Sequence, residues 1–447
     1  MPPQEERADP LLATLTEPPT CQNRLRMDQI DPNAFVSRRS IYRHESFLVQ
    51  FATTDGPPQI VLLILLLALG FGSTIGVVPA VMTDRYARLN HGFVDDQNCA
   101  DFTMGHKPQE CLDGSADAQN AAAFASLVSN TFTFVTSSMI GSISDERGRK
   151  GIMLLGIFLS TLTPLCLVLL QLIPSMSPTW YYIAGTFSGL VNWIAVALSS
   201  LSDVMPPKWR AASFGMLLAG FSLGFALAPT MALFLDHFHV SLLSLTTISI
   251  GFVVIAVFFP ETLPPETAAE ASRCRVLEFQ TIPSGWRRAF YVILRPVREL
   301  SILNRNNLFR LLSSLAFFSG MVSSGDQTLL IYFVEERLAF DDRDVATMFM
   351  LMGILGILVQ GVLLKPINDC FGERMVVVSA FCIGSLDNML YGLAKNKATI
   401  FVAISMSAFT GMAFPTISAI KANNVVCVLS CRVYTMALRP SARCASW

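Results

Sequence analysis

The stretch GSISDERGRK, residues 141–150, lies between two apolar runs that are each long enough to cross a lipid bilayer. It holds three basic and two acidic side chains together with two glycines. Glycine permits a tight change of chain direction, and Lys and Arg collect in the cytosolic loops of membrane proteins. We therefore interpret this stretch as the cytosolic turn of a transmembrane hairpin, and it orients the other predicted spans.

The composition predicts an all-α, polytopic membrane protein in contact with lipid. Of its 447 residues, 52% are hydrophobic and 15% are charged, whereas a soluble domain carries about 25% charged residues. No basic face with interleaved aromatic residues suggests a nucleic-acid partner. The ten Cys form no CxxC pair and the five His lie outside the apolar runs, so we expect no metal site and no cofactor.

Apolar runs of about 20 residues predict about ten transmembrane helices, six followed by four. The predicted spans are 59–82, 120–140, 151–173, 179–201, 211–235, 240–259, 307–334, 345–364, 375–394 and 399–420. They divide the chain into a disordered cytosolic tail (1–58), a six-helix half (59–259), a cytosolic linker (260–306), a four-helix half (307–422) and a final segment (423–447). Three Arg close before the first span favour a cytosolic N-terminus.

An internal repeat links two of the predicted cytosolic turns. Asp145, Gly148 and Lys150 correspond to Asp369, Gly372 and Arg374 at a constant offset of 224 residues. Two parallel six-span halves, with a site near the bilayer midplane between them, are a known transporter construction. The same offset places a fifth span of the second half at about 435–459. Since the chain ends at residue 447, we expect its second half to hold only four spans.

The turn at 141–153 resembles the signature G-x-L-x-D-x-x-G-R-K-x-x-L of the major facilitator superfamily, departing only at Ile143 and Met153. Three further stretches, at 203–210, 215–232 and 260–263, are similar to the family's turn before span 5, its span-5 antiporter motif and its exit from span 6. Residues 327–340 and 344–360 resemble the tetracycline-resistance-like, hippocampus-abundant-transcript-like branch. The resemblance covers about 59–422 and implies secondary active transport by alternating access.

The resemblance implies a cytosolic gate made by both turns. Its residues are Gly141, Asp145, Gly148, Arg149, Lys150, Asp369, Gly372 and Arg374. We expect Asp145 to cap the third span and to pair with a basic side chain; the alternative is a solvated hairpin turn. In the family the first turn contacts an eleventh span, which we expect this chain to lack, and residues 423–447 resemble nothing in the family.

Asp326 and Asp387 are the acidic residues well inside the predicted spans. Because a charged Asp at the bilayer centre costs about 2.5–3.5 kcal/mol on insertion scales, such residues usually face a cavity or a partner. Each is a candidate for binding a proton or a substrate, and the alternative for Asp326 is a place lining the outer mouth. Other polar candidates for substrate contact are Asn130, Asn192 and Gln360, for which hydrogen bonding between helices is the favoured alternative.

Two further predictions concern local structure. Gly215, Gly224 and Pro229 are expected to bend the fifth span, since Pro removes a helical hydrogen bond. Cys99 and Cys111 share a polar loop on the non-cytosolic side, where they form either a disulfide or two free thiols.

From these features we predict a non-enzymatic transporter that exchanges a small solute across a membrane, coupled to protons. No nucleophile–base pair supports an enzyme. The alternative is a truncated, non-transporting or regulatory membrane protein of the same fold.

Overall fold

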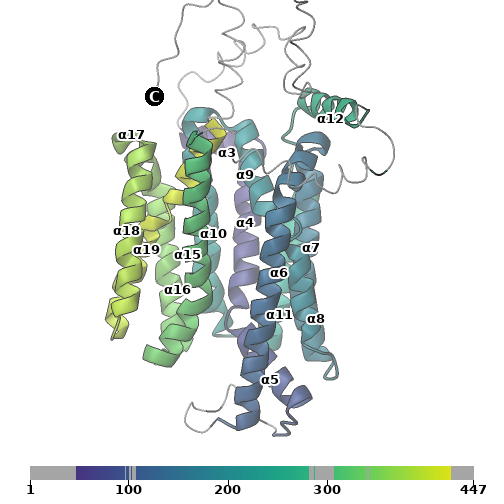
Figure 1. The fold of residues 1–447 in the computed structure, drawn as a ribbon, viewed down its shortest axis with the longest axis vertical. Coiled ribbons are helices and arrows are strands. Elements are labelled where there is room, and N and C mark those ends of the chain that lie inside the picture. The colour runs from purple at the N-terminus through teal and green to yellow at the C-terminus, as the bar shows by residue number, and fades with distance from the viewer. Residues whose placement is uncertain are drawn as a thin grey trace, which may run out of the picture.

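The protein, described here from a computed structural model, is a bundle of long helices that lie side by side along one axis (Figure 1). The structure describes residues 47–95, 97–99, 102, 107–280, 286, 307–338, 340 and 342–423, and within these ranges it contains helices and no strands. The remaining parts of the predicted tail, linker and final segment lie outside the described residues.

A first group of helices covers the predicted six-span half. It consists of α3 (Phe47–Thr53), α4 (Pro57–Ser73), α5 (Val77–Asn90), α6 (Gln109–Arg147), α7 (Arg149–Leu172), α8 (Thr179–Ser188), α9 (Trp193–Val204), the short η1 (Pro207–Trp209), α10 (Arg210–Ala232) and α11 (His237–Phe258). In the predicted linker, α12 (Pro265–Gln280) lies at the end of the bundle that holds residues 141–150 (Figure 1). We call this the motif end and the opposite one the loop end.

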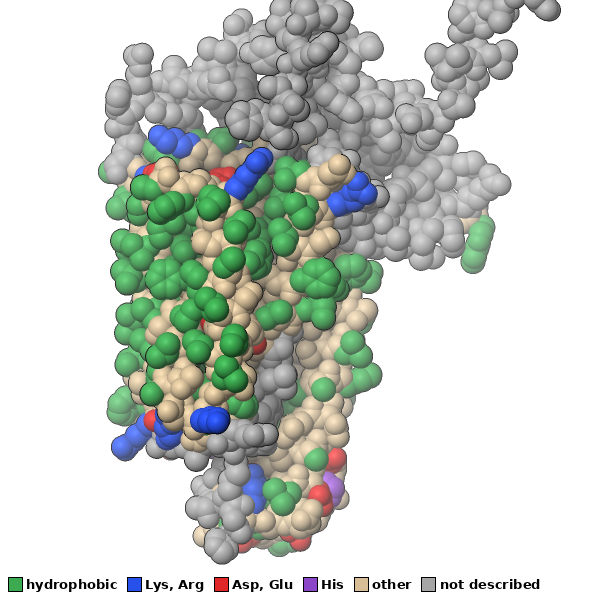
Figure 2. Space-filling model, turned by 60° about the vertical axis from the view of Figure 1, so that its left-hand side comes forward, with side chains coloured by type: hydrophobic (Ala, Val, Ile, Leu, Met, Phe, Trp, Pro, Cys, Tyr) green, Lys and Arg blue, Asp and Glu red, His purple; other side chains and the backbone are tan. Residues whose placement is uncertain are grey.

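A second group follows the linker and packs beside α10. It consists of α15 (Asn307–Leu338), α16 (Asp342–Gly356), the π-helical η3 (Ile357–Leu363), α17 (Leu364–Phe371), α18 (Glu373–Leu393) and α19 (Lys397–Thr410), after which helix resumes through Asn423. On the face shown in Figure 2, apolar side chains cover the middle of this group and Lys and Arg lie near its two ends. This pattern is that of a surface embedded in lipid.

Seven of the described helices are long and apolar enough to cross a membrane, or nine if each of two bent pairs counts as one span. All ten predicted spans fall on described helices, but α15, at 32 residues, belongs to neither set, so the predicted number of ten is not confirmed.

Helix boundaries differ from the prediction at three places. The first span is broken between α4 and α5, where Ser73 and Thr74 hydroxyls bond to backbone carbonyls at 2.9 Å and compete with the helical ladder. Helix α6 begins 11 residues earlier than the span predicted from residue 120, because it continues beyond its apolar part. The predicted disordered tail contains α3, since Phe47 and Phe51 are buried and Phe47 packs edge-on against Trp209.

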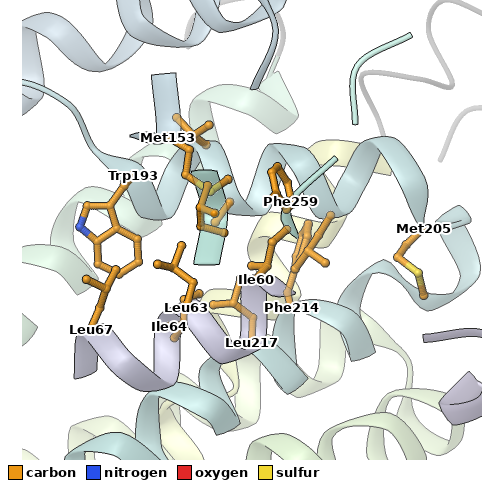
Figure 3. Close-up of a cluster of buried hydrophobic side chains, with 14 of the residues drawn as sticks. Ile60, Leu63, Ile64, Leu67, Met153, Trp193, Met205, Phe214, Leu217 and Phe259 are labelled. Atoms are coloured by element: carbon orange, nitrogen blue, oxygen red, sulfur yellow. The ribbon is translucent and has the colours of Figure 1, made fainter. Parts of the chain in front are cut away.

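The core of the first group is built around α4. Ile60, Leu63, Ile64 and Leu67 recur at helical spacing and are at most 1% exposed. In Figure 3 they lie among Met153 of α7, Trp193 of α9, Phe214 of α10 and Phe259, which directly follows α11. Glycines let the neighbouring helices approach α4 closely, as a Cβ on Gly224 would come within 2.6 Å of the Ala68 Cβ and 2.7 Å of the Leu65 carbonyl.

Small residues also join the two groups of helices. Helix α10 packs along α16 and η3. A Cβ on Gly215 would lie 2.6 Å from the Gln360 carbonyl, and one on Gly353 would lie 2.2 Å from the Ala226 Cβ. Both groups therefore meet at backbone-to-backbone distance along α10.

Replacing Gly224 with Ala is expected to destabilise the bundle by about 1–3 kcal/mol, the typical cost of overpacking, because the new methyl group meets backbone atoms of α4. The matched control is Gly185→Ala in α8, where nothing lies within 4 Å of the added Cβ. Thermal unfolding of the purified protein in detergent measures both. Equal unfolding temperatures for the two variants would contradict the close approach.

Candidate functional site

The turn between α6 and α7 depends on the backbone of Gly148. Its φ and ψ are 96° and 162°, a region that essentially only glycine adopts. Its amide still bonds to the Ser144 carbonyl at 3.1 Å, so α6 runs to the turn and α7 starts immediately after it.

The guanidinium of Arg149 binds three helix ends together. Its side chain is only 8% exposed and contacts the Asp145 carboxylate at 2.6 Å and the Asp203 carboxylate at 2.9 Å. It also donates to the Ser144 hydroxyl at 3.1 Å. Arginine suits this position because its planar fork offers several fixed donors. Helices α6, α7 and α9 are joined at one buried charge.

The start of α7 is capped by Glu261, which follows α11. Its carboxylate accepts hydrogen bonds from the Arg149 amide at 2.8 Å and the Lys150 amide at 3.1 Å. A carboxylate at this position satisfies amides that lack helical partners and faces the positive end of the helix dipole. The expectation that Asp145 caps this helix is therefore corrected. Asp145 lies in the last turn of α6, on the other side of Gly148, and pairs with the Arg149 side chain instead.

The second turn has the same backbone conformation as the first, but within the described residues it lacks the corresponding network of ion pairs. Gly372 has φ 79° and ψ 150°, close to the values of Gly148. Asp369 pairs with Lys365 at 2.9 Å, but their side chains are 61% and 40% exposed, so the pair contributes little. Arg374 is exposed. At the position that corresponds to Arg149 the chain has Glu373, whose charge suits the start of α18 directly.

A contact across the two groups lies at the motif end. Arg210, 8% exposed, donates to the Ser202 carbonyl at 3.0 Å and to the Asn423 side chain at 3.2 Å. Asn423 belongs to the helical segment that follows α19, so this bond joins the first group to the second. Together with the contact of Gly215 with η3, it holds the groups against each other at this end.

A second polar centre lies inside the second group, around Asp387 of α18. This residue is 2% exposed, and its Oδ2 atom accepts from the Thr410 hydroxyl of α19 at 3.4 Å. The Ser407 hydroxyl and the Asp326 carboxylate of α15 also interact with it. Its Oδ1 atom is fully buried and has no hydrogen-bond partner among the described residues. We call Asp326, Asp387, Ser407 and Thr410 the carboxylate cluster.

Gln360 lies beside this cluster. It belongs to the π-helical segment η3, and single π-turns often mark functional sites. Its Nε2 atom would lie 2.6 Å from a Cβ on Gly411, the residue after Thr410. Its Oε1 atom is buried and, within the described parts of the chain, unpaired. Two buried oxygens that lack donors therefore flank the end of α19.

The other predicted polar residues have local roles. Asn130 is exposed and donates to the Ser126 hydroxyl of its own helix at 3.2 Å. Asn192 caps α9, where its side chain accepts from the Ala195 amide at 3.2 Å. Neither residue belongs to the carboxylate cluster. Thr133 and Thr136 of α6 donate to the Gly189 and Leu190 carbonyls, at 2.8 Å each, which satisfies the break between α8 and α9.

The remaining predicted positions are structural. Gly215 and Gly224 lie at close approaches between helices, and α10 continues through Pro229 to Ala232, so a bend there stays a prediction. Cys99 and Cys111 form a disulfide with a Cα–Cα distance of 5.6 Å, at the loop end. A cleft of about 780 Å³ near this end, between α5, α7 and α11, is lined by none of the predicted site residues.

Three residues of the motif-end network, Asp203, Arg210 and Glu261, are absent from the predicted site. Each lies in a stretch that resembles a family motif, which was the available signal. Glu261 lies 112 residues after Arg149, whose amide it accepts from, and no feature of the sequence links the two residues. Only the fold reveals this contact.

Long apolar helices in two packed groups, with buried charges at helix ends and inside a span, define a polytopic α-helical membrane protein of transporter architecture. Residues 60–425 match the Major Facilitator Superfamily, and the chain belongs to this family. Among its relatives, the mouse Hippocampus abundant transcript 1 protein is 23% identical over 300 residues, which cover 66% of this chain and 57% of that protein. The bovine Major facilitator superfamily domain-containing protein 10 is 25% identical over 56% of this chain and 54% of its own length. The chain thus spans little more than half of these relatives.

Solved structures show the same fold. The human organic anion transporter MFSD10 (TETRAN) aligns with a TM-score of 0.61 and 20% identity, covering 85% of this chain and 86% of that one. The proton:xylose symporter XylE, solved with 6-bromo-6-deoxy-D-glucose bound, aligns with a TM-score of 0.51 and 14% identity, covering 82% of each chain.

Replacing Gly148 with Ala should disrupt the motif turn. The substitution forces a glycine-only conformation, which costs about 1–3 kcal/mol, and places a Cβ 2.4 Å from the Glu261 carboxylate. Gly141→Ala in the same motif is the control, since nothing lies within 4 Å there. We expect faster hydrogen exchange of the first amides of α7 in Gly148→Ala alone. Identical exchange in both variants would mean that Glu261 does not cap this helix.

Proposed function

We propose that the protein is a secondary active transporter that moves a small solute by alternating access and couples this movement to protons. The buried Asp387, with one carboxylate oxygen unpaired inside a membrane-spanning helix, carries the proposal. Family membership and the transporter fold support transport rather than catalysis. The excess of Lys and Arg in residues 141–150 supports a cytosolic motif end and a cytosolic N-terminus.

The contacts suggest which parts move together. Charge-assisted bonds of Arg149 and Glu261 tie α6, α7, α9 and the end of α11 into one body. By contrast, the Arg210–Asn423 bond between the groups has a neutral acceptor and is expected to contribute about 1.5–3 kcal/mol. We infer that opening of the motif end breaks this bond and separates α10 from η3 and α17, while the Arg149 network stays intact.

Proton binding at Asp387 offers a way to couple this motion to a gradient. A charged carboxylate that is shielded from water inside a membrane is costly, whereas its protonated form is neutral and can donate a hydrogen bond. The groups that face Asp387 are Asp326, Ser407 and Thr410, and Tyr391 lies one turn further along α18. Contact with water in one state and burial in the other would then release and bind a proton in each cycle.

Asp387→Asn should abolish gradient-driven uptake and leave solute exchange intact when the solute is saturating, because the amide resembles the protonated carboxyl and cannot titrate. The full chain is reconstituted in liposomes, a mixture of cellular small molecules is supplied with a pH gradient, and mass spectrometry identifies what accumulates. Asp55→Asn, an exposed carboxylate between α3 and α4, is the matched control. Unchanged gradient dependence in Asp387→Asn would rule out coupling at this residue.

The same experiment tests the rival function. A protein that folds and reconstitutes but accumulates and exchanges no solute under any gradient would be a non-transporting or regulatory member of the family.

A further inference from the structure

We propose that the transported solute is a cation, with a protonated amine as its recognised group, and that it binds at the carboxylate cluster beside Gln360. This inference rests on the proposed function, because it specifies the solute of the same transporter. It is drawn from the charges and the hydrogen-bonding groups of the second group of helices.

The first observation is the sign of charge inside the predicted spans. Asp326 and Asp387 lie within them, whereas Lys and Arg occur towards span ends and in turns, as Arg310, Lys365 and Lys421 do. The two carboxylates interact electrostatically with each other. An anionic solute would meet these carboxylates with no basic side chain nearby within the described spans, in surroundings where water does not screen the repulsion. A cation would relieve the repulsion between the two acids.

The second, independent observation is a shortage of donors. The Asp387 Oδ1 and Gln360 Oε1 atoms are both buried and both without a partner in the described structure. The Thr410 hydroxyl already donates to the other oxygen of Asp387. Unpaired buried acceptors are costly, so a ligand that fits this place brings N–H donors. An ammonium group has up to three donors and the charge that Asp387 requires.

The two acids differ in burial, and this difference sets the order in which a ligand would reach them. Asp326 is half-buried and Asp387 is 2% exposed, so the amine meets Asp326 first and then reaches Asp387. Gln360 lies in the segment that packs against α10 at Gly215 and Ala219. A ligand bound to Gln360 would therefore act directly on the boundary between the two groups of helices, where alternating access requires movement.

The human transporter MFSD10 is described as carrying organic anions, and this applies to that protein only. At 20% identity, its similarity to this chain shows a common fold and does not indicate a common substrate. The acids and the unpaired oxygens of this chain favour the opposite sign.

The test uses the purified full chain at neutral pH and small matched probes, each scaffold supplied as a primary amine, an alcohol and a carboxylate. One such set is tyramine, tyrosol and 4-hydroxyphenylacetate. Thermal unfolding measures binding.

We expect amines to raise the unfolding temperature more than their matched alcohols and carboxylates. Asp387→Asn should weaken amine binding by about thirtyfold or more, the usual effect of removing one partner of a buried charge pair, while Asp55→Asn binds as the unmodified chain does.

A second measurement needs no variant and guards against misfolding of Asp387→Asn. A hydrophobic carbodiimide labels buried carboxyl groups. A tertiary amine, which cannot form an amide with the activated carboxyl group, should protect the peptide that contains Asp387 more than the matched alcohol does. Three outcomes would each overturn the proposal. They are stabilisation of the protein by carboxylates, equal amine binding by Asp387→Asn and the unmodified chain, and no effect of any amine in either measurement. Gradient-driven uptake of an acidic or neutral solute would overturn it while leaving the transport function standing.

Discussion

The pairing of the buried Arg149 guanidinium is the interaction on which the first group of helices depends. A charge removed from water needs partners, and here it has two carboxylates and a hydroxyl from the ends of two other helices, α6 and α9. The Glu261 carboxylate then satisfies the amide of the same residue, which brings in the chain after α11. Removing either carboxylate would leave the buried Arg149 guanidinium with less counter-charge. The positions of α6, α7, α9 and the exit of α11 are therefore set together.

In the second group, by contrast, the buried charged residue is incompletely paired. Its turn has the same glycine geometry as the first, but Glu373 replaces the arginine and the nearby Asp369–Lys365 pair is exposed. Its buried charge is Asp387, which lies deep in a span and has an unpaired oxygen. A fully paired charge fixes a structure, whereas an incompletely paired one is available to a ligand. The same physical constraint thus accounts for the rigidity of the first group and for the binding that we propose in the second.

Much of the fold follows from the sequence because lipid imposes a simple rule: apolar stretches of sufficient length become helices. This rule predicted the helix positions, and the glycines and charges between the apolar runs predicted the turns at Gly148 and Gly372. It missed the helix ends, since α6 continues into polar residues and α3 lies in a stretch without an apolar run of sufficient length. It also missed the capping by Glu261 and the approach of Gln360 to Gly411. These contacts arise from residues far apart in sequence, and no local periodicity reports them.

The boundary between the two groups combines close packing with weak polar bonding, and this combination suits a sliding or rocking contact. Close packing at Gly215 and Gly353 brings the backbone of α10 directly against η3 and α16. The Arg210–Asn423 bond adds specificity at the motif end without a charge on its acceptor. Within the first group, separating α6 from α7 would expose an arginine bound to two carboxylates, which costs more. In the proposed transport cycle, a ligand or a proton that changes the charge near Gln360 would separate the groups at this boundary before either group deforms.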